Sequence, residues 1–454
     1  MKKILKLRVL LLVLTSLIIV TSCDSDNDIS SKTIKVNNFI KENMDAYYLW
    51  NEEMPDLNPS KQKDSEAYFY DLIYDDIDRW SYITDDANSL YDYFDGIRKE
   101  MGYSLMFYLA YENNDNDVVA LVEYVEPNSP AAIAGLKRGD MIVKYNDEYL
   151  TRDNINDFYY AEEAKIGLGV YVDGLIEDVS PSINLTAAEL QINPILVNKV
   201  FVKDGNKVGY LAYTSFISDF DDELKDVFAA FKSEGITDLI LDLRYNGGGA
   251  VSTAKLMAGM IGPSSKENDL FIRTAYNDIL TDFLEGEYGA DSEYFIDNFE
   301  SYETDLDLNR LYVLTTSGTA SASEMVMYSL MPYMDVIQIG EQSHGKYYAS
   351  ITIEDEEGMN WAIQPLIYRA ENKTNSIDYS QGLIPDYEVM DRDYDHQLGD
   401  ENEALTATAL DLIWGTNMAQ ESLKSIKKPA LLNTSAIKTK RNPLKYEMYI
   451  DREL

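Results

Sequence analysis

The chain has 454 residues, of which 45% are hydrophobic and 12% aromatic. That is the composition of a globular protein with two or three domains, and it excludes a disordered chain. The 39 basic and 79 acidic residues give a net charge of −40, which argues against nucleic acid and anionic lipid headgroups as partners of the protein body.

The N-terminus is typical of an export signal. Four basic residues precede an apolar stretch, 9–20, that is short for a membrane span. Val20-Thr21-Ser22 then leads into Cys23, the only cysteine. This resembles a bacterial lipobox, whereas an ordinary signal peptide is the alternative. We therefore expect a lipoprotein signal peptide over 1–22 and a lipid on Cys23, which leaves no thiol for disulfide or catalytic chemistry.

Residues 23–35 are predicted to form an acidic tether after the lipid anchor, because Asp24-Ser25-Asp26-Asn27-Asp28 is polar and charged. The tether resembles the acidic export signals of some surface lipoproteins. The resemblance implies a lipid-anchored protein in the cell envelope of a Gram-negative-type bacterium, at the outer membrane, on its periplasmic or surface face.

Residues 36–100 are predicted to form a helical region. Apolar residues recur there at helical spacing in two stretches, 36–47 and 68–73, which Asn58-Pro59-Ser60 separates. The region also contains several large aromatic side chains. These could line a substrate groove, but packing against the next domain is the more common role for such residues: Tyr47, Tyr48, Trp50 and Trp80.

Residues 101–195 follow a strand pattern, with strands expected at 118–125 and 141–145. Between them, Ser129-Pro130-Ala131 opens a short helix that runs to Ala134-Gly135-Leu136 and to the turn Gly139-Asp140. This run resembles the PDZ domain. The resemblance implies that Gly102-Tyr103-Ser104-Leu105 is the loop that binds a peptide's terminal carboxylate, with the peptide added as a strand. A purely structural lid is the alternative.

Residues 196–418 alternate between strands and helices. Strands are expected at 208–216, 239–244, 311–314 and 336–340, and Gly235 is expected to end the helix at 220–231. Such units predict a largely parallel sheet whose functional residues gather at the C-terminal ends of its strands. The basic segment 419–454 is predicted to be a tail that docks on the acidic body in cis.

Ser321 and Lys346 each lie in a turn that follows one of these strands, and they are 25 residues apart. That length accommodates a helix and a return strand, so both side chains can reach one sheet edge. A serine beside a lysine is a nucleophile beside a base if burial keeps the amine neutral. The pair predicts a hydrolase, with Lys346 taking the Ser321 proton and returning it to the leaving amine.

The remaining requirement of acyl transfer is a set of backbone donors for the oxyanion. We expect these to be the amides of Gly248, of Ala322 and, as a further candidate, of Gly247. A helix cap is the alternative explanation of the serine turn, because Glu324 stands three residues after Ser321 as in a capping box.

Other chemistries find less support. The Gly-Gly-Gly run lacks the Gly-Lys-Ser/Thr of a phosphate-binding loop. The chain has two histidines, His344 in a turn near Lys346 and His396 in an acidic stretch expected to be solvated, so a histidine-based triad is disfavoured. No cluster has the spacing of metal ligands, and no cofactor is expected.

Together these segments resemble the C-terminal processing (tail-specific) serine peptidases that carry a PDZ domain. The resemblance rests on Asp242-Leu243-Arg244-Tyr245-Asn246-Gly247-Gly248, Ser321-Ala322-Ser323-Glu324, Gly340-Glu341 through Gly345-Lys346, and Gly382-Leu383-Ile384-Pro385-Asp386. It implies an α/β core similar to the crotonase and Clp-protease folds, a Ser–Lys dyad, and cleavage of proteins near their C-termini. It also selects Ser321 over Ser317 and Ser323, which the residues alone left open.

One position departs from that family. Many members carry a glutamine four residues after the lysine, where this chain has Ser350. Either Ser350 or another residue, with Gln342 and Gln364 as candidates, orients Lys346, or activity is reduced. A catalytically silent scaffold that binds peptides is therefore the competing hypothesis. A carbohydrate-binding lipoprotein, suggested by the 35 tyrosines, lacks a spaced aromatic platform.

Overall fold

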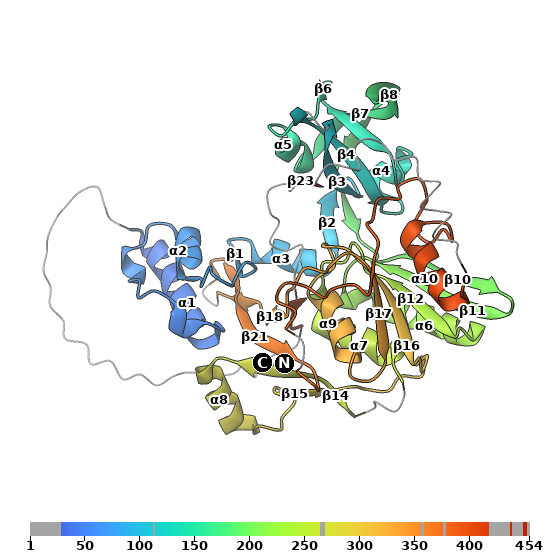
Figure 1. Ribbon diagram of the computed structural model, residues 1–454. Helices are drawn as coiled ribbons and strands as arrows, with labels where there is room; N and C mark the ends of the chain where they lie inside the picture. The colour runs from blue at the N-terminus through green and yellow to red at the C-terminus, as the bar shows by residue number, and fades with distance from the viewer. Residues whose placement is uncertain are drawn as a thin grey trace, which may run out of the picture.

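A computed structural model describes residues 29–111, 114–263, 268–355, 358–375, 378–416, 436–437 and 448–451. The predicted signal peptide, Cys23 and most of the basic tail lie outside these residues. Within them, no helix is both long and apolar enough to cross a membrane. Figure 1 shows a small helical region, a strand-rich domain above, and a larger α/β core.

The helical region begins at Ser31, five residues before the predicted boundary, because Ser30 Oγ accepts from Thr33 N–H and caps the first helix. Both expected helical stretches are confirmed. The region also contains two short strands that the sequence reading missed, one of which, β1, pairs with β20 of the core. Its elements are α1 (Ser31–Tyr47), η1 (Asn51–Glu53), η2 (Pro59–Lys61), α2 (Ser65–Leu72), β1 (Tyr82–Thr84), α3 (Ala87–Phe94) and β2 (Ile97–Glu100).

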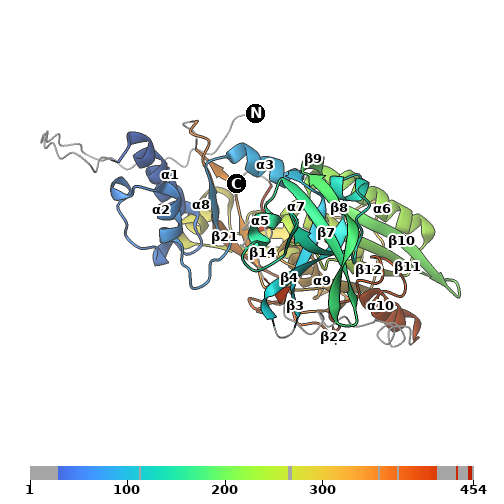
Figure 2. The same cartoon turned by 90° about the horizontal axis from the view of Figure 1, so that it is seen from above.

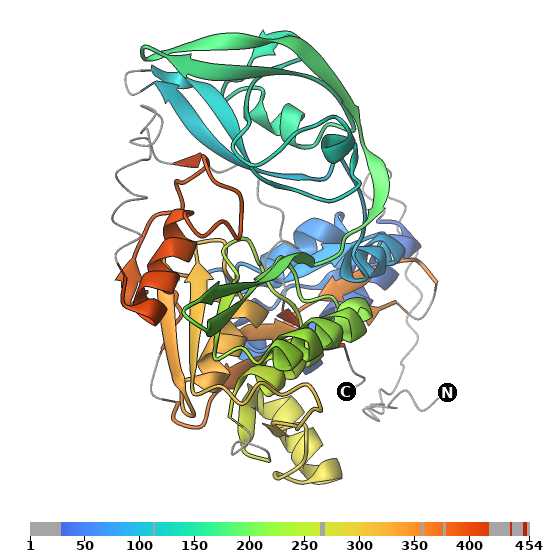
Figure 3. The same ribbon diagram turned by 90° about the vertical axis from the view of Figure 1, so that its right-hand side faces the viewer.

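The strand-rich domain matches the predicted PDZ unit and stands apart from the core in Figure 3. Its sheet has the order β23-β3-β4-β5-β7-β8. Two further strands, β2 and β9, pair with each other where the domain meets the core. The elements are β3 (Tyr103–Tyr111), β4 (Asn114–Val125), α4 (Pro130–Ile133), β5 (Met141–Tyr145), β6 (Glu148–Tyr149), α5 (Ile155–Tyr159), β7 (Glu163–Val172), β8 (Leu175–Thr186), β9 (Ala188–Gln191) and β23 (Ala436–Ile437).

The core contains the predicted parallel sheet, in the order β10-β11-β12-β16-β17-β22. Only the β10–β11 pair is antiparallel. Gly235, at φ 69°, ends α6 in the left-handed conformation, as expected. The elements are β10 (Ile195–Lys203), β11 (Asn206–Tyr213), η3 (Ser218–Phe220), α6 (Asp221–Glu234), β12 (Asp238–Asp242), β16 (Arg310–Thr315), β17 (Asp335–Gly340) and β22 (Tyr387–Glu388).

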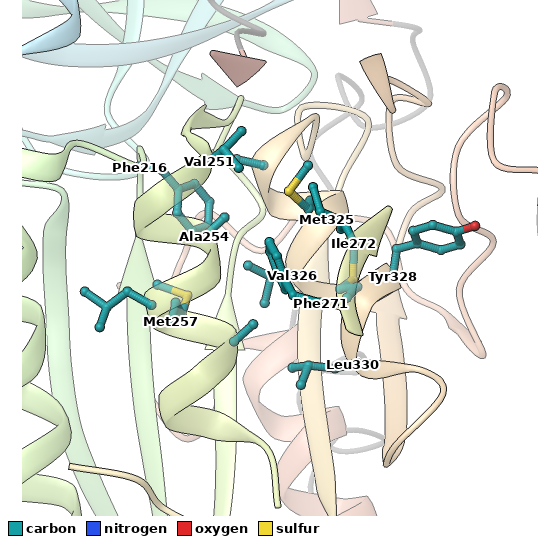
Figure 4. Close-up of a cluster of buried hydrophobic side chains, with 14 of the residues drawn as sticks. Phe216, Val251, Ala254, Met257, Phe271, Ile272, Met325, Val326, Tyr328 and Leu330 are labelled. Carbon is teal, nitrogen blue, oxygen red and sulfur yellow. The ribbon is translucent and has the colours of Figure 1, made fainter. Parts of the chain in front are cut away.

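Both faces of this sheet are covered, because alternate strand residues point to opposite sides. Leu241 and Val313 pack with α6, α7 and α9, whereas Ile240 and Leu314 pack with α10. Figure 2 shows α6 and α10 on opposite sides of β11 and β12. Figure 4 shows α7 and α9 facing each other across Val251, Ala254, Met325 and Val326. This packing fixes α9, whose N-cap is Ser321.

A second core sheet has the order β13-β24-β18-β21-β14-β15. The sequence pattern does not predict this second sheet, because most of its strands are short and pair with distant parts of the chain. The remaining core elements are β13 (Gly249–Ala250), α7 (Val251–Ile261), β14 (Leu270–Tyr276), α8 (Asp278–Tyr288), β15 (Ile296–Asn298), α9 (Ala322–Leu330), β18 (Tyr348–Ser350), β19 (Ile353–Glu354), β20 (Ala362–Gln364), β21 (Leu366–Glu371), α10 (Ala404–Trp414) and β24 (Met448–Tyr449).

A buried ion network ties the PDZ-like domain to the end of β12. Arg244 binds Asp242, Asp391 and Glu403 at 2.9–3.0 Å. Arg138, from the Gly139-Asp140 turn of the PDZ-like domain, donates to the same Asp391 oxygen at 2.9 Å. All of these side chains are nearly inaccessible to solvent. The network therefore fixes the start of the glycine turn, which begins directly after Arg244.

Candidate active site

The three predicted turns meet at the C-terminal edge of the parallel sheet. β12, β16 and β17 are adjacent, and each turn leaves one of them. The first two turns are joined directly: Thr319 Oγ1 donates to Leu243 O at 2.8 Å, and Ala320 N–H donates to Asn246 O at 3.1 Å. The serine turn and the glycine turn therefore form one rigid unit.

Ser321 has a backbone conformation that is rare for a residue with a side chain. Its φ is 65° and its ψ is −117°, at the N-cap of α9. Such a conformation costs on the order of 1–3 kcal/mol and persists where the surrounding structure enforces it, most often at functional sites. Ser321 is fully buried, and its Oγ has no hydrogen-bond partner among the described residues. The capping box expected from the sequence is present, since Glu324 accepts from the Ser321 N–H at 2.8 Å, but a cap does not account for the strained backbone.

Glu324 connects Ser321 to Lys346. Its Oε2 accepts hydrogen bonds from Ser321 N–H at 2.8 Å and from Lys346 N–H at 2.9 Å. Because one oxygen binds both groups, the backbone nitrogens of Ser321 and Lys346 are separated by at most the sum of these two hydrogen-bond lengths. Oε1 accepts from Gly345 N–H at 2.7 Å and from Ser343 Oγ at 2.6 Å. One carboxylate thus anchors both turns of the predicted dyad.

The Glu324 carboxylate is completely buried. Burial disfavours its charge and raises its pKa to about 7, although the four hydrogen bonds that it accepts oppose this shift. A buried carboxyl is costly unless it is hydrogen-bonded, and here four donors from the two turns supply those bonds.

Lys346 is enclosed by the protein. The residue is fully buried, and its Nζ lies 6.0 Å from the ring centre of Trp80, which comes from the helical region. Trp80 Nε1 donates to His344 Nε2 at 3.4 Å, and His344 N–H donates to Thr319 O at 2.9 Å. His344 is thus a half-buried bridge between Trp80 and the serine turn.

The other aromatic residues of the helical region have packing roles. Tyr48 is buried and donates to Asp78 at 3.0 Å, and Trp50 packs on Tyr348 with ring centres 5.0 Å apart. His396 is partly buried and hydrogen-bonds Asp393 at 2.9 Å, so it is less solvated than expected.

The three candidates for lysine support lie in different places. Ser350 is buried on β18. The Gln342 side chain donates to Gln381 O at 2.7 Å in an exposed turn. Gln364 is buried on β20, where its Nε2 donates to Thr352 Oγ1 at 2.9 Å. The Nε2 groups of both glutamines thus donate to Gln381 O and Thr352 Oγ1.

The glycine turn adopts a conformation that only glycine tolerates. Gly248 has φ 118° and Gly249 φ 138°, and a Cβ on Gly249 would lie 2.1 Å from Phe216 O. The Gly248 N–H donates to Asn246 Oδ1 at 2.9 Å. In this conformation the predicted oxyanion donor is therefore occupied by its own turn. Ala322 is the first residue of α9, where a backbone N–H has no partner within the helix.

A cavity of about 160 Å³ lies between the PDZ-like domain and the glycine turn. Its lining includes Tyr103, Ser104 and Leu105 from the predicted carboxylate loop together with Gly247–Gly249. Gly102 itself has φ 79° and packs directly against Ser129. The structure thus brings the predicted peptide-binding loop and the predicted oxyanion turn to the same cavity.

For three residues at this site the sequence predicted either no role or a different one. Glu324 was seen only as a cap, and its spacing from Ser321 could not show that it also reaches Lys346. Asn246 belonged to a recognised motif but had no assigned role. Trp80 was noted only as an aromatic residue, and no local pattern could place it beside a lysine 266 positions later.

Comparison with known families agrees with this arrangement. The family model "Peptidase family S41" matches residues 207–389, and "Peptidase S41 N-terminal domain" matches residues 35–82. A PDZ domain model matches residues 121–161. The chain belongs to the S41 C-terminal processing peptidase family with a PDZ domain.

A solved structure covers nearly the whole fold of this S41 chain. It is a candidate S41 protease from Bacteroides fragilis NCTC 9343, with 27% identity and a TM-score of 0.68. The match covers 84% of this chain and 98% of that one. The mixed α/β peptidase fold with a PDZ insert and an N-terminal helical region is therefore confirmed.

The curated relatives are described as peptidases, and the chain spans only part of their length. A protein described as a CtpA-like serine protease of Staphylococcus aureus (strain N315) is 26% identical over 234 residues, which are 51% of this chain. The chloroplastic C-terminal processing peptidase of Tetradesmus obliquus is 25% identical over 293 residues and 61% of this chain. The chain spans 42% of the length of the first relative and 58% of the second.

Proposed function

We propose that the chain is a serine endopeptidase that hydrolyses peptide bonds near the C-termini of proteins. Ser321 is the nucleophile and Lys346 the general base. The observation that carries the proposal is the buried Glu324 carboxylate, one oxygen of which binds the backbone N–H groups of both residues. The strained Ser321 backbone and the full burial of Lys346 support it independently.

The reaction needs no cofactor. Neutral Lys346 takes the proton of Ser321 Oγ as that oxygen attacks the substrate carbonyl carbon. The tetrahedral oxyanion is held by the amides of Ala322 and the glycine turn, for which Gly248 must release Asn246 Oδ1. Lys346 then gives its proton to the leaving amine, and water hydrolyses the Ser321 ester in a second, equivalent step.

The proposed substrates are proteins with free C-termini. The loop Gly102–Leu105 is the site proposed for the terminal carboxylate, and the cavity that it shares with Gly247–Gly249 supports this choice. A substrate held there would be close to the oxyanion turn. The PDZ-like domain would thus select chain ends for the core.

A serine-reactive fluorophosphonate probe tests the nucleophile. The purified protein is expected to gain one adduct, located on Ser321 by peptide mapping, because the probe labels only an activated serine. Lys346→Ala should slow labelling by about 10²-fold or more, since the base is lost. Mass spectrometry measures both rates. Absence of any adduct on a folded protein would instead support the silent peptide-binding scaffold, which the serine at position 350 also favours.

We also propose that Cys23 carries a lipid that anchors the protein in the cell envelope of a Gram-negative-type bacterium. The lipobox-like Val20-Thr21-Ser22-Cys23 run supports this proposal. Cells fed an alkyne fatty acid should label the wild-type protein, whereas Cys23→Ala should lose the label and leave the membrane fraction. Equal labelling of the two proteins would refute the anchor.

A further inference from the structure

Two separate pieces of the C-terminal segment pair with strands on either side of the candidate site. β23 lies antiparallel to β3, with Ala436 opposite Tyr108 and Ile437 opposite Phe107, as the adjacent labels in Figure 1 indicate. β24 lies parallel to both β13 and β18. The chain thus adds a strand to the PDZ-like domain and then another to the peptidase core.

The direction of β23 matches that of an incoming peptide. Its residues run from opposite Tyr108 to opposite Phe107, and therefore toward Tyr103 and the predicted carboxylate loop at the start of β3. An added strand on a sheet edge is a general way to bind an extended chain, because main-chain hydrogen bonds supply affinity with little demand on sequence.

β24 lies between the two halves of the candidate site. β13 begins directly after Gly248, and β18 begins two residues after Lys346. Within the sheet, Met448 pairs with Gly249, and Tyr449 pairs with both Ala250 and Ser350. β24 therefore lies between the strand that follows the oxyanion turn and the strand that follows the lysine, and it runs parallel to both.

Side chains and main-chain bonds hold this segment in place. Ile450 N–H donates to Ser350 O at 3.0 Å, and Ser252 Oγ donates to the Asp451 carboxylate. Tyr449 is 6% exposed, stacks on Phe94 with ring centres 4.1 Å apart, and lines the cavity shared by the carboxylate loop and the glycine turn. The segment therefore occupies part of the space through which a substrate would pass.

We infer that the edge of β3 and the gap between β13 and β18 are where this peptidase binds extended polypeptides, and that its own residues 436–437 and 448–451 occupy these places as an intramolecular competitor. The inference rests on the proposed function and adds its binding mode. Charge favours this occupant, because residues 419–454 are rich in lysine and the chain as a whole carries −40. A tethered segment acts at an effective concentration in the millimolar range, so a few main-chain bonds suffice.

The variant Ile450→Pro tests the inference. It removes the N–H that donates to Ser350 O and should release β24, whereas the control Ile450→Ala keeps that N–H and loses only side-chain packing. The probe is a fluorescent peptide with the sequence of residues 445–452, and anisotropy measures its binding. We expect the peptide to bind Ile450→Pro about tenfold more tightly than either the wild type or Ile450→Ala.

The kinetic readout should agree. With a peptide substrate, Ile450→Pro is expected to lower KM by a similar factor and to leave kcat unchanged. Equal peptide affinity in all three proteins, or no binding in any, overturns the inference. A rise in KM together with a lower melting temperature also overturns it, because β24 is then a permanent strand of the core.

The failure of the proposed function is distinguishable from the failure of this inference. Peptide binding does not require hydrolysis, so anisotropy reports on this binding even if no peptide is cleaved. If Ile450→Pro does not fold, Tyr449→Ala, which removes the stacking on Phe94, provides the same comparison with Ile450→Ala. Tighter peptide binding by Tyr449→Ala is then the expected result, and unchanged binding overturns the inference.

Discussion

Replacing Ser321 by alanine is expected to lower the kcat of peptide hydrolysis by about 10⁴-fold or more, with KM nearly unchanged. The Oγ is the only atom of the residue that forms the acyl bond, and loss of a serine nucleophile is typically of this size. The change removes a buried hydroxyl that has no hydrogen-bond partner among the described residues. Stability should therefore stay level or rise, and thermal unfolding measures this beside the kinetics.

Ser323 provides a matched control in the same turn. It is as buried as Ser321, but its Oγ donates to Asn246 O at 3.0 Å. Ser323→Ala should therefore cost about 1 kcal/mol of stability and change kcat by only a few fold. A Ser321→Ala protein with full activity, or a Ser323→Ala protein with none, would show that the nucleophile is misassigned.

Arg244→Met should lower the free energy of unfolding by about 3–5 kcal/mol, the largest stability effect that we expect. The guanidinium binds three carboxylates, those of Asp242, Asp391 and Glu403, at 2.9–3.0 Å in a site that water barely reaches. Methionine fills much of the volume but leaves these carboxylates without that charge. Urea unfolding at neutral pH measures the loss.

Arg310→Met is the matched control at the other end of the same sheet. Arg310 pairs with Asp238, but 45% of its side chain is exposed, so the pair is screened by water and should contribute less than about 1 kcal/mol. Equal losses from the two substitutions would show that burial of the Arg244 network contributes nothing.

The pH dependence of the Arg244 effect has a definite sign. Burial alone would raise the pKa of Glu403, but the Arg244 charge and hydrogen bonds lower it to about 2, below the ordinary 4.5. A depressed folded pKa contributes stability above about pH 4.5 that is lost as the pH falls toward 2. The difference between wild type and Arg244→Met should therefore narrow over that range. A difference that widens there would contradict the assignment.

The parts of the fold that sequence predicted are those that local chemistry specifies. Gly235 ends α6 because the left-handed conformation suits glycine, and the apolar run at 239–243 forms a central strand because nothing else could bury it. The PDZ-like turns follow from Ser129 and Gly139 in the same way. Parallel strands then bring the turns after β12, β16 and β17 to one edge.

The parts that sequence missed depend on contacts between distant residues. β2 pairs with β9 some ninety positions later, and β24 lies beside β13 and β18 from the far end of the chain. Short strands of two to four residues carry too little periodicity to be recognised alone. The predicted helical region therefore also contains two strands, and the second core sheet was not foreseen.

The sequence by itself indicated the peptidase family, the parallel sheet and the two residues proposed as the dyad. The sheet follows from local strand and turn patterns, whereas the choice of Ser321 over Ser317 and Ser323 depended on the family resemblance. Only the tertiary structure decided how Ser321 and Lys346 are held, because Glu324 binds both backbones across 22 positions and Trp80 covers the lysine from another region. The tertiary structure also decided that β23 and β24 pair with strands near the site. Any extended chain can pair with a strand edge, and only the fold determines which part of the chain comes close enough to do so.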